Sequence, residues 1–278
     1  MKVLITGGLG YLGTVIAKHL ETDHEIEIVD LKNGRDFRDI KEIKADAVVH
    51  LAAIVGDRQC AIKPGLSRET NFRSIDRLTR LCKRSSVRRF IFASTCSIYG
   101  ADSVANCFES SRINPISLYA TTKYAAERTL LKSESETFHP TILRFGTAFG
   151  QSPSMRYNLV VNMFAKGIAD EGRIVIHGGD QFRPFIHTTD IARAIASVLK
   201  APIYKVSGEI FNIANENITL NGLGELIRNE YPWVDVRHSH ECRDKRTYRV
   251  NTFKAWKVLG FMPEISIKQG LKEMVENV

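Results

Sequence analysis

The sequence has few cysteines and no long hydrophobic run. A transmembrane helix needs about 20 consecutive apolar residues, and no window of this chain approaches that length. The first predicted strand starts almost at Met1, so we expect no signal or transit peptide. Five scattered cysteines without a C-x-x-C pair are typical of reduced thiols in the cytoplasm rather than of disulfides or a zinc site. These cysteines are Cys60, Cys82, Cys96, Cys107 and Cys242. We therefore expect a cytoplasmic protein with no membrane contact and no metal site.

Acidic residues are fewer than basic ones, 31 against 39, and the formal net charge is +8. Basic residues gather modestly at Lys83-Arg84, at Arg88-Arg89 and within residues 237–249. These groups lack the aromatic interleaving and the motifs that are typical of nucleic-acid-binding proteins. We therefore expect the positive charge to serve a small polyanionic ligand, and we expect no nucleic acid to bind.

A glycine-rich turn joins the first predicted strand, residues 1–6, to the first predicted helix, residues 11–20. Gly7 permits the tight turn, Gly10 lets the backbone approach a pyrophosphate, and Gly13 lets the helix pack closely on the strand. The start of the helix offers free N–H groups and the positive end of its dipole to phosphates. This order of elements predicts a dinucleotide-binding site.

An acidic residue closes the second predicted strand, residues 25–29. Asp30 follows Gly13 by seventeen residues, where a carboxylate accepts hydrogen bonds from a ribose diol. The same carboxylate repels the 2′-phosphate of NADP, so NAD is the expected cofactor. Lys32 and Arg35 lie nearby in the sequence, and their charges would soften this preference.

Predicted strands and helices continue to alternate along the next hundred residues. The predicted strands span residues 46–51, 89–94 and 140–145, and one predicted helix spans residues 66–82. Ser117 is the expected N-cap of a further helix that runs to about residue 131. This alternation predicts an α/β fold, a doubly wound parallel sheet of Rossmann type. We expect an NAD-binding domain over residues 1–150, with added elements from about 184–214, and a smaller C-terminal α/β lobe for the substrate over residues 151–278.

Two polar side chains lie four residues apart on the last of these helices. Tyr119 and Lys123 therefore leave the helix on one face. A nearby ammonium group favours phenolate over phenol, which lowers the pKa of a tyrosine toward the range of a general base. Together with the glycine-rich turn, this pair predicts a catalytic site that holds a dinucleotide.

The spacing Gly7-x-x-Gly10-x-x-Gly13, followed by Tyr119-x-x-x-Lys123, resembles the extended short-chain dehydrogenase/reductase family. Within it, the chain is similar to the NAD-dependent nucleotide-sugar epimerases and dehydratases, such as UDP-glucose 4-epimerases, over nearly its whole length. The resemblance implies a nucleotide-diphosphate sugar as substrate. It also implies a homodimer that packs through the helices near Asp76 and Tyr124.

Further segments resemble those that hold NAD in this family. His50-Leu51-Ala52-Ala53 resembles the strand beneath the cofactor, and residues 36–39 resemble the segment that holds adenine. The segment between Asp30 and Asp36 is shorter than usual in the family, which predicts a more open adenosine side. The resemblance implies the following cofactor-binding residues: Gly7, Gly10, Tyr11, Leu12, Gly13, Asp30, Asp36, Phe37, Leu51, Ala52, Ala53, Asn71, Tyr119 and Lys123.

Four residues after the midpoint of the chain resemble substrate-binding positions of the family. Arg183, followed by Pro184, resembles the arginine that contacts the substrate diphosphate, and Arg246 belongs to a second arginine-bearing segment. Arg156 and Asn158 lie where relatives bind substrate. His50 and His187, in contrast, are expected to be packed core histidines.

The residues after the fourth predicted strand bear on the type of reaction. Ser94-Thr95-Cys96-Ser97 resembles the segment that carries the catalytic Ser or Thr, so the implied catalytic residues are Thr95, Tyr119 and Lys123. Family 4,6-dehydratases have Asp-Glu after this threonine, because elimination of water needs an acid and a base. Cys96 and Ser97 supply no carboxylate, which favours a 4-epimerase that oxidises its substrate transiently to a 4-keto sugar. A nucleotide-sugar 4-dehydrogenase or reductase, a 4,6-dehydratase and a non-catalytic NAD(H)-binding protein stay open as alternatives.

Overall fold

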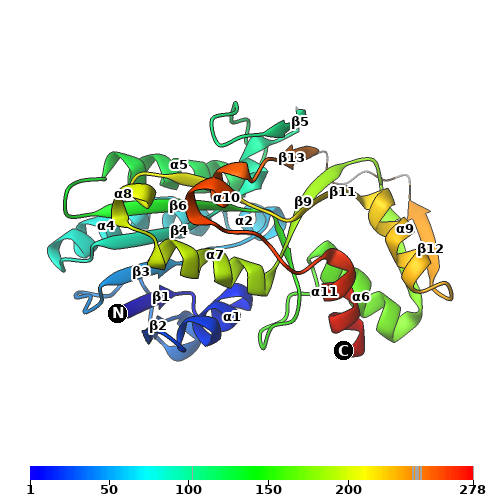
Figure 1. Ribbon diagram of the computed structural model, residues 1–278, viewed down its shortest axis with the longest axis horizontal. Helices are drawn as coiled ribbons and strands as arrows, with labels where there is room; N and C mark the ends of the chain where they lie inside the picture. Colours follow the sequence, from blue (N-terminus) through cyan, green and yellow to red (C-terminus); the bar gives the residue numbers. More distant parts are fainter. Residues whose placement is uncertain (102, 240, 242–243, 245, 278) are drawn as a thin grey trace.

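The computed structural model describes residues 1–101, 103–239, 241, 244 and 246–277 (Figure 1). Cys242 lies outside the described residues. The other four cysteines are buried and form no disulfide with one another.

Six parallel strands form the large sheet, in the order β10-β6-β4-β3-β1-β2. The strands are β1 (Lys2–Thr6), β2 (Glu25–Val29), β3 (Ala47–His50), β4 (Arg89–Thr95), β6 (His139–Phe145) and β10 (Ile210–Ile213). From β1 the chain first adds β2 on one side and then β3 on the other, so the winding direction reverses between β1 and β3. In an open parallel sheet, ligands bind outside the carboxyl ends of the strands at such a reversal.

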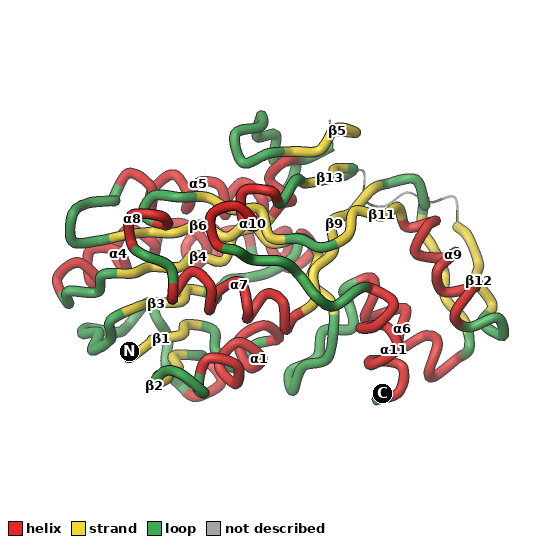
Figure 2. Tube along the Cα trace, viewed as in Figure 1, coloured by secondary structure: helices red, strands yellow, loops and turns green. Residues whose placement is uncertain are grey.

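Helices cover both faces of this sheet, as a doubly wound fold requires (Figures 1 and 2). Helices α1 (Tyr11–Leu20) and α7 (Thr188–Lys200) pack on one face, where their apolar side chains join those of β1, β3 and β4. Helices α4 (Ser74–Arg84) and α5 (Leu118–Lys132) bury their apolar side chains against the other face. The predicted fold class is therefore confirmed.

The predicted single helix over residues 66–82 is wrong. The structure has a short helix α3 (Pro64–Arg68), one π-helical turn η2 (Glu69–Arg73) and then α4. Leu66 is exposed, so it does not belong to the apolar face of α4. The wider π turn contains Asn71. The buried amide of Asn71 accepts a hydrogen bond from Ile54 N and donates one to Ile54 O. π-helical turns are frequently found at functional sites, and this one fixes the loop after β3.

The segment after β2 contains a single 3-10 turn, η1 (Leu31–Asn33), before β3 begins. Strand β2 is consequently the edge of the large sheet. Phe37 fills part of this edge, because its ring is buried and packs edge-on against His50 with ring centroids 4.9 Å apart. Residues of this connection, which contains no further strand among the described residues, form the pocket wall beyond β2.

A smaller lobe lies beside the carboxyl ends of the large sheet (Figure 1). Its helices share one apolar core that is separate from the cores of the large sheet. They are α6 (Val160–Glu171), α9 (Leu220–Glu230) and α11 (Ile267–Glu276). Its strands are β7 (Thr147–Phe149), β8 (Arg173–His177), β9 (Phe182–His187), β11 (Glu216–Thr219) and β12 (Asp235–Ser239), paired as β11-β9-β7 and β12-β8.

The chain crosses between the two parts more than once. Helix α7 and strand β10 return to the large sheet from the smaller lobe, within the stretch 184–214. Helix α10 (Phe253–Leu259) also packs against β10, and its Ala255 belongs to the core of the large sheet. The remaining elements are α2 (Asp57–Ile62), η3 (Cys96–Tyr99), α8 (Ile203–Val206), and β5 (Ser103–Cys107), which pairs with β13 (Tyr248–Val250).

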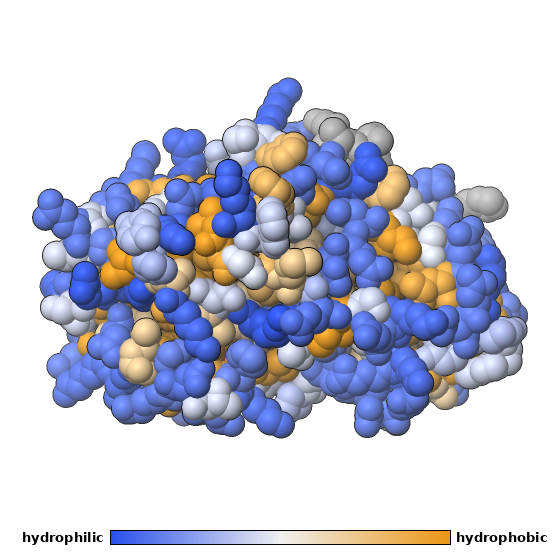
Figure 3. Space-filling model, in the orientation of Figure 1, coloured by the Kyte–Doolittle hydropathy of each residue, from blue (hydrophilic) through white to orange (hydrophobic). Residues whose placement is uncertain are grey.

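Hydrophilic side chains cover most of the face drawn in Figure 3, and hydrophobic ones gather there in smaller patches. No helix in the described part of the chain is long and apolar enough to span a membrane. Among the described residues, no three His, Cys, Asp or Glu side chains gather closely enough to hold a metal ion.

Candidate active site

A pocket of about 1040 Å³ opens at the carboxyl ends of the large sheet, where the winding direction reverses. The residues that line it come from the glycine-rich turn, the ends of β2, β3 and β4, helix α5 and the smaller lobe. Of the residues that the sequence singles out, the pocket wall contains Gly7, Gly10, Tyr11, Leu12, Gly13, Asp30, Asp36, Phe37, Leu51, Ala52, Ala53, Thr95, Tyr119, Lys123, Arg156, Asn158, Arg183 and Arg246.

Among the predicted cofactor-binding residues, Asn71 is the exception, because it does not line the pocket. Its side chain is buried, accepts a hydrogen bond from Ile54 N and donates to Ile54 O and to Thr122 Oγ1. Asn71 therefore shapes the loop after β3 from behind instead of facing the cofactor. The sequence contains no local signal that distinguishes these two roles.

The glycine-rich turn is built as the spacing predicts. Gly7 has a φ of +75°, and a Cβ there would lie 2.8 Å from Ala52 N. Gly10 is the N-cap of helix α1 and has no side chain, so the first-turn N–H groups of the helix have no capping side chain. Unsatisfied N–H groups at a helix start bind anions. The turn therefore fits the pyrophosphate of a dinucleotide.

The two acidic residues of the adenosine side already have protein partners. Asp30 accepts hydrogen bonds from Leu9 N at 3.0 Å and from Lys32 N at 2.9 Å. Asp36 is paired with Arg38, whose guanidinium lowers the pKa of the Asp36 carboxyl. These contacts hold the carboxylates in the pocket wall.

The cations near Asp30 are also engaged. Lys32 Nζ donates to Leu9 O and to Ser154 Oγ, and Arg35 pairs with Glu27 at 2.8 Å. Both side chains therefore bind groups of the protein itself, which makes them less available to the 2′-phosphate of NADP. This arrangement fits NAD better than NADP.

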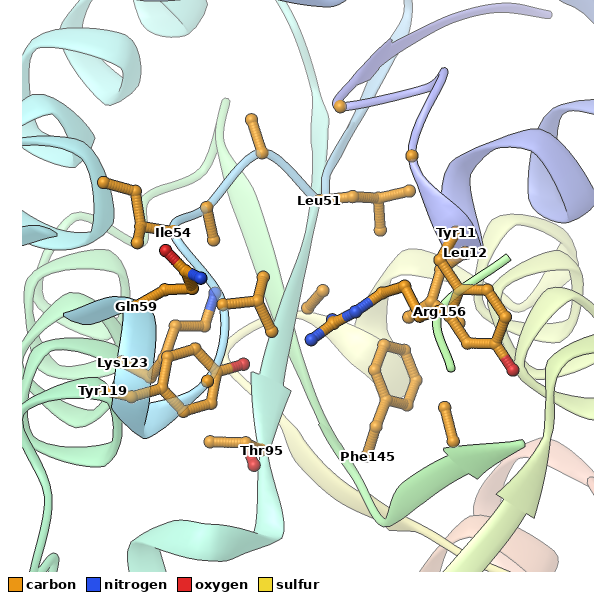
Figure 4. Close-up of a pocket in the computed structure, with 18 of the residues that line it drawn as sticks. Tyr11, Leu12, Leu51, Ile54, Gln59, Thr95, Tyr119, Lys123, Phe145 and Arg156 are labelled. Atoms are coloured by element: carbon orange, nitrogen blue, oxygen red, sulfur yellow. The ribbon is translucent and has the colours of Figure 1, made fainter. Parts of the chain in front are cut away.

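Tyr119 and Lys123 project from α5 toward the pocket, beside Thr95 at the end of β4 (Figure 4). Ser117 is the N-cap of helix α5, and its Oγ accepts a hydrogen bond from Ala120 N. Thr95 Oγ1 lies 2.9 Å from Ser97 Oγ and accepts a hydrogen bond from Ser97 N. Cys96, in contrast, points into the core and bonds Arg144 O.

The predicted lowering of the Tyr119 pKa by Lys123 is wrong. Burial raises the pKa of Tyr119, and the charge that opposes this rise is that of Arg156. Lys123 is itself almost fully buried, with Nζ 3.9 Å from the centre of the Phe92 ring. Its burial lowers the pKa of Lys123 to about 7, although Glu127 one turn away opposes this. At neutral pH the side-chain amine of Lys123 is therefore only partly protonated. Its reduced positive charge has a weaker effect on the pKa of Tyr119.

The low pKa of Lys123 predicts a pH-dependent gain in stability when its charge is removed. An unfolded lysine has a pKa of about 10.4, so between about pH 7 and that value the unfolded chain binds more protons and stability rises with pH. Below about pH 7 Lys123 is also protonated in the folded chain, so burial of its charge lowers the free energy of unfolding by the full amount. We expect Lys123→Met to raise the melting temperature by about 3 °C or more at pH 6, and by less at pH 9.

Differential scanning calorimetry at both pH values measures this difference. Lys132→Met is the control, because Lys132 lies on the same helix and is exposed. An equal shift of the Lys123→Met melting temperature at pH 6 and pH 9 would show that the Lys123 pKa is not depressed.

A buried polar network supports the catalytic helix from behind. Arg144 on β6 pairs with Glu127 of α5 at 2.8 Å and donates to Tyr99 Oη. Tyr99 in turn donates to Asn212 of β10, and Ser94 donates to Glu127. These contacts fix α5 to the large sheet one turn beyond Lys123. The sequence analysis missed this network, because its members lie on five elements, β4, η3, α5, β6 and β10, and share no spacing.

The mouth of the pocket contains paired arginines. Arg246 forms ion pairs with Asp57 of α2 at 3.0 Å and with Asp244, and Arg183 pairs with Asp244 at 2.9 Å. Neither Asp57 nor Asp244 was predicted from the sequence. The shared carboxylate of Asp244 therefore holds Arg183 and Arg246 near each other in the pocket wall.

Arg156 differs from these two arginines. Its side chain reaches into the pocket from the wall opposite Tyr119 and Lys123 (Figure 4). No ion pair of Arg156 is found within the described residues, and its Nε bonds only Asn158 Oδ1, at 3.4 Å. Burial lowers the pKa of Arg156. A half-buried guanidinium without a carboxylate partner suits an anionic ligand.

The two histidines are structural, as the sequence predicts. His50 is buried, bonds Thr6 Oγ1 at 2.6 Å and stacks on Phe92. His187 is buried beside Phe149, and its Nε2 lies 3.2 Å from Glu273 of α11. Neither histidine lines the pocket.

The sequence matches the NAD dependent epimerase/dehydratase family over residues 3–214. A UDP-glucuronate 4-epimerase of Thermodesulfobacterium geofontis is 32% identical over 260 residues, which cover 89% of this chain and 77% of that protein. The structure also resembles the UDP-glucuronic acid 4-epimerase of Bacillus cereus, with a TM-score of 0.87, 24% identity and coverage of 99% and 98% of the two chains.

Dehydratases share the same fold. The dTDP-glucose 4,6-dehydratase DesIV of Streptomyces venezuelae has a TM-score of 0.86 and 24% identity, and the likeness covers 99% of this chain and 96% of that one. The fold alone therefore does not separate the two reactions. This chain belongs to the NAD dependent epimerase/dehydratase family of nucleotide-sugar enzymes, and its cofactor is NAD.

Proposed function

We propose that this protein is an NAD-dependent nucleotide-sugar 4-epimerase. The observation that carries this proposal is the set of acids in the pocket. The carboxylates among the described lining residues are Asp30, Asp36 and Asp57. The first two belong to the adenosine side, and Asp57 is paired with Arg246. Beside Tyr119 the chain places the hydroxyls of Thr95 and Ser97, which supply no acid and base for the elimination of water.

The residues of the pocket have distinct roles in the proposed reaction. When bound, NAD supplies a reversible hydride acceptor. Since burial raises the pKa of Tyr119, the step requires that its hydroxyl first be deprotonated. The phenolate of Tyr119 then takes the proton of the sugar 4-hydroxyl and later returns it, while Thr95 donates a hydrogen bond to the same oxygen as its charge develops. Lys123 would hold the cofactor ribose, and the glycine-rich turn would hold the pyrophosphate.

The sugar must turn within the pocket for its 4-position to be inverted. The paired arginines Arg183 and Arg246 suit a diphosphate that stays in place during this rotation. Arg156 reaches toward the sugar side, opposite Tyr119, and its unpaired charge favours a substrate that bears an anionic group there. The relative from Thermodesulfobacterium geofontis acts on UDP-glucuronate, which has a carboxylate on its sugar.

A product assay tests the proposal. The purified protein is incubated with NAD and either UDP-glucose or UDP-glucuronic acid, followed by other nucleotide-sugars, and products are separated by chromatography with mass detection. A new product of unchanged mass, without net NADH formation, is the expected result. A product lighter by one water would identify a dehydratase, and accumulating NADH would identify a dehydrogenase. Tight NAD binding without any product would favour a non-catalytic protein.

We also propose the homodimer that the family resemblance implies, through α4 and α5. The exposed face of this region is strongly basic, because four arginines at helical spacing follow one line: Arg73, Arg77, Arg80 and Arg84. Of these, Arg80 is paired with Asp76, at 3.0 Å. A two-fold contact across this face brings like charges close together.

The repulsion predicts an inverted salt dependence for this dimer. Because salt screens like charges, we expect the dimer dissociation constant to fall as NaCl rises from about 0.05 M to about 0.5 M. Arg77→Glu should strengthen the dimer at low salt, whereas Lys205→Glu, on an exposed residue of α8, should not. Sedimentation equilibrium measures both effects. A dimer that weakens with added salt, or a monomer under all conditions, would contradict this interface.

A further inference from the structure

A buried asparagine of the smaller lobe joins the cofactor side of the pocket to its substrate side. Asn162 lies in the first turn of α6 and has no exposed surface. It does not line the pocket, and it belongs to no motif that the sequence analysis identified. Nevertheless, its amide contacts three residues from two segments, Tyr11 at the start of α1 and both Gly150 and Arg156 in the loop between β7 and α6, and of these Tyr11 and Arg156 line the pocket.

The hydrogen bonds of Asn162 fix the orientation of its amide. Oδ1 accepts from Gly150 N at 3.2 Å, and Nδ2 donates to Arg156 O at 3.1 Å and to Tyr11 Oη at 2.9 Å. A backbone N–H can only donate and a backbone carbonyl can only accept. The reverse orientation of the amide would therefore lose both backbone contacts, so this side chain has one arrangement.

Tyr11 is the partner on the cofactor side. It is the first residue of α1, directly after Gly10, and its ring lines the pocket. Its hydroxyl accepts from Asn162 and donates to Gly150 O at 2.9 Å, which closes a ring of hydrogen bonds. Ser152 Oγ adds a bond to Tyr11 O at 2.7 Å. The glycine-rich turn is thus tied to the segment that follows β7.

Arg156 is the partner on the substrate side. Asn162 Nδ2 donates to the backbone carbonyl of Arg156. The Arg156 side chain crosses the pocket so far that its Nη2 lies 3.9 Å from the position that a Cβ on Gly56 would take. Arg156 Nε also contacts Asn158. A shift of the Asn162 amide therefore displaces both the segment that carries Arg156 and the hydroxyl of Tyr11.

We propose that Asn162 is a positioning residue that couples NAD binding to nucleotide-sugar binding. Tyr11 would lie beside NAD held at the glycine-rich turn, Tyr11 and Gly150 hold Asn162, and Asn162 holds the carbonyl of Arg156. Each ligand therefore binds more tightly when the other is present, since both require the same arrangement of this ring. The inference rests on the proposed roles of the two ends of the pocket, but it does not depend on which reaction follows.

Calorimetric titration tests the coupling directly. NAD is titrated into the protein with and without saturating UDP-glucuronic acid, and the ratio of the two dissociation constants is the coupling factor. We expect a factor of about 5 or more for the unaltered protein and a factor near one for Asn162→Ala. Asn162→Asp, which keeps the acceptor for Gly150 N but loses both donors, should give the same loss.

Two comparisons separate coupling from a loss of stability. Thr141→Val removes a similarly buried hydrogen bond, from the Thr141 hydroxyl on β6 to Val206 O on α8, and neither residue lines the pocket. It should lower the melting temperature but keep the coupling factor. Tyr11→Phe should reduce the coupling factor, and Asn162→Ala should then add little in the Tyr11→Phe background, because the two residues act through one contact.

The possible outcomes of the titration test the coupling separately from the proposed reaction. A coupling factor of one in the unaltered protein overturns it, as does a factor that survives Asn162→Ala, and so does a protein that binds no UDP-glucuronic acid. Coupled binding that disappears in Asn162→Ala supports the inference even if no sugar is epimerised, a result that would contradict only the proposed function.

Discussion

Replacement of Tyr119 by phenylalanine is expected to lower the turnover number by about 10²–10⁴-fold, the usual contribution of a general acid–base group. The change removes only the hydroxyl, which has no hydrogen-bond partner among the described residues. The ring that lines the pocket remains. We therefore expect the melting temperature and the affinity for NAD to stay close to those of the unaltered protein.

Product formation from the nucleotide-sugar identified in the screen measures this effect, and calorimetry measures NAD affinity. Tyr124→Phe is the matched control, because Tyr124 lies on the same helix and its hydroxyl contacts Arg128 at the surface. Full activity of the Tyr119→Phe protein would remove Tyr119 from the catalytic site. A loss of NAD binding in this variant would instead assign Tyr119 to the cofactor site alone.

Gly13→Ala is expected to weaken NAD binding by about 100-fold, which corresponds to roughly 2.7 kcal/mol. A Cβ at this position would lie 2.2 Å from Gly7 O and 2.6 Å from the carbonyl carbon and Cα of Gly8. All three are backbone atoms, so no side-chain rotation relieves the contact. Helix α1 must move away from the turn, and its first N–H groups then no longer point at the pyrophosphate.

The control for this substitution is Gly65→Ala. Gly65 lies in α3, and a Cβ there meets no atom within 4 Å, so we expect it to be neutral or slightly stabilising. Calorimetric titration of NAD into both variants gives the comparison, and their melting temperatures show how much of the effect is loss of fold. NAD affinity of the Gly13→Ala protein within about twofold of the unaltered value would contradict the proposed fit of the turn to the cofactor.

The two substitutions together separate the parts of the site. Tyr119→Phe should remove turnover and keep NAD binding, whereas Gly13→Ala should remove NAD binding and with it turnover. Because Tyr119 comes from α5 and Gly13 from the glycine-rich turn, equal losses of NAD affinity would assign both residues to the cofactor site.

Segments whose structure depends on short-range patterns could be predicted from the sequence. The predicted helix over residues 11–20 and the strand over residues 25–29 have the same bounds in the structure, and β6 differs from its predicted range by one residue. Tyr119 and Lys123 share one helix, as their spacing requires. The backbone conformation of a glycine at a turn and the spacing of side chains along a helix are local properties, because each depends on a few neighbouring residues.

The directions of buried side chains and their pKa values depended on packing. Nothing in Thr95-Cys96-Ser97 states that Cys96 enters the core while Thr95 and Ser97 face the pocket. Likewise, the spacing of Tyr119 and Lys123 predicts a lowered tyrosine pKa, but burial reverses this direction and lowers the pKa of Lys123 instead. Desolvation depends on the atoms around a group, which sequence spacing does not describe.

By itself, the sequence determined the class of fold, the glycine-rich turn proposed to hold the dinucleotide, and the family to which the chain belongs. Only the tertiary structure decided which carboxylates hold Arg183 and Arg246, and that Asn162 bonds Tyr11 from a position 151 residues away. The physical reason is the range of the interactions. Backbone geometry and helical periodicity act between near neighbours in the chain, whereas ion pairs and buried hydrogen bonds form between segments that only the packing of the two parts brings together.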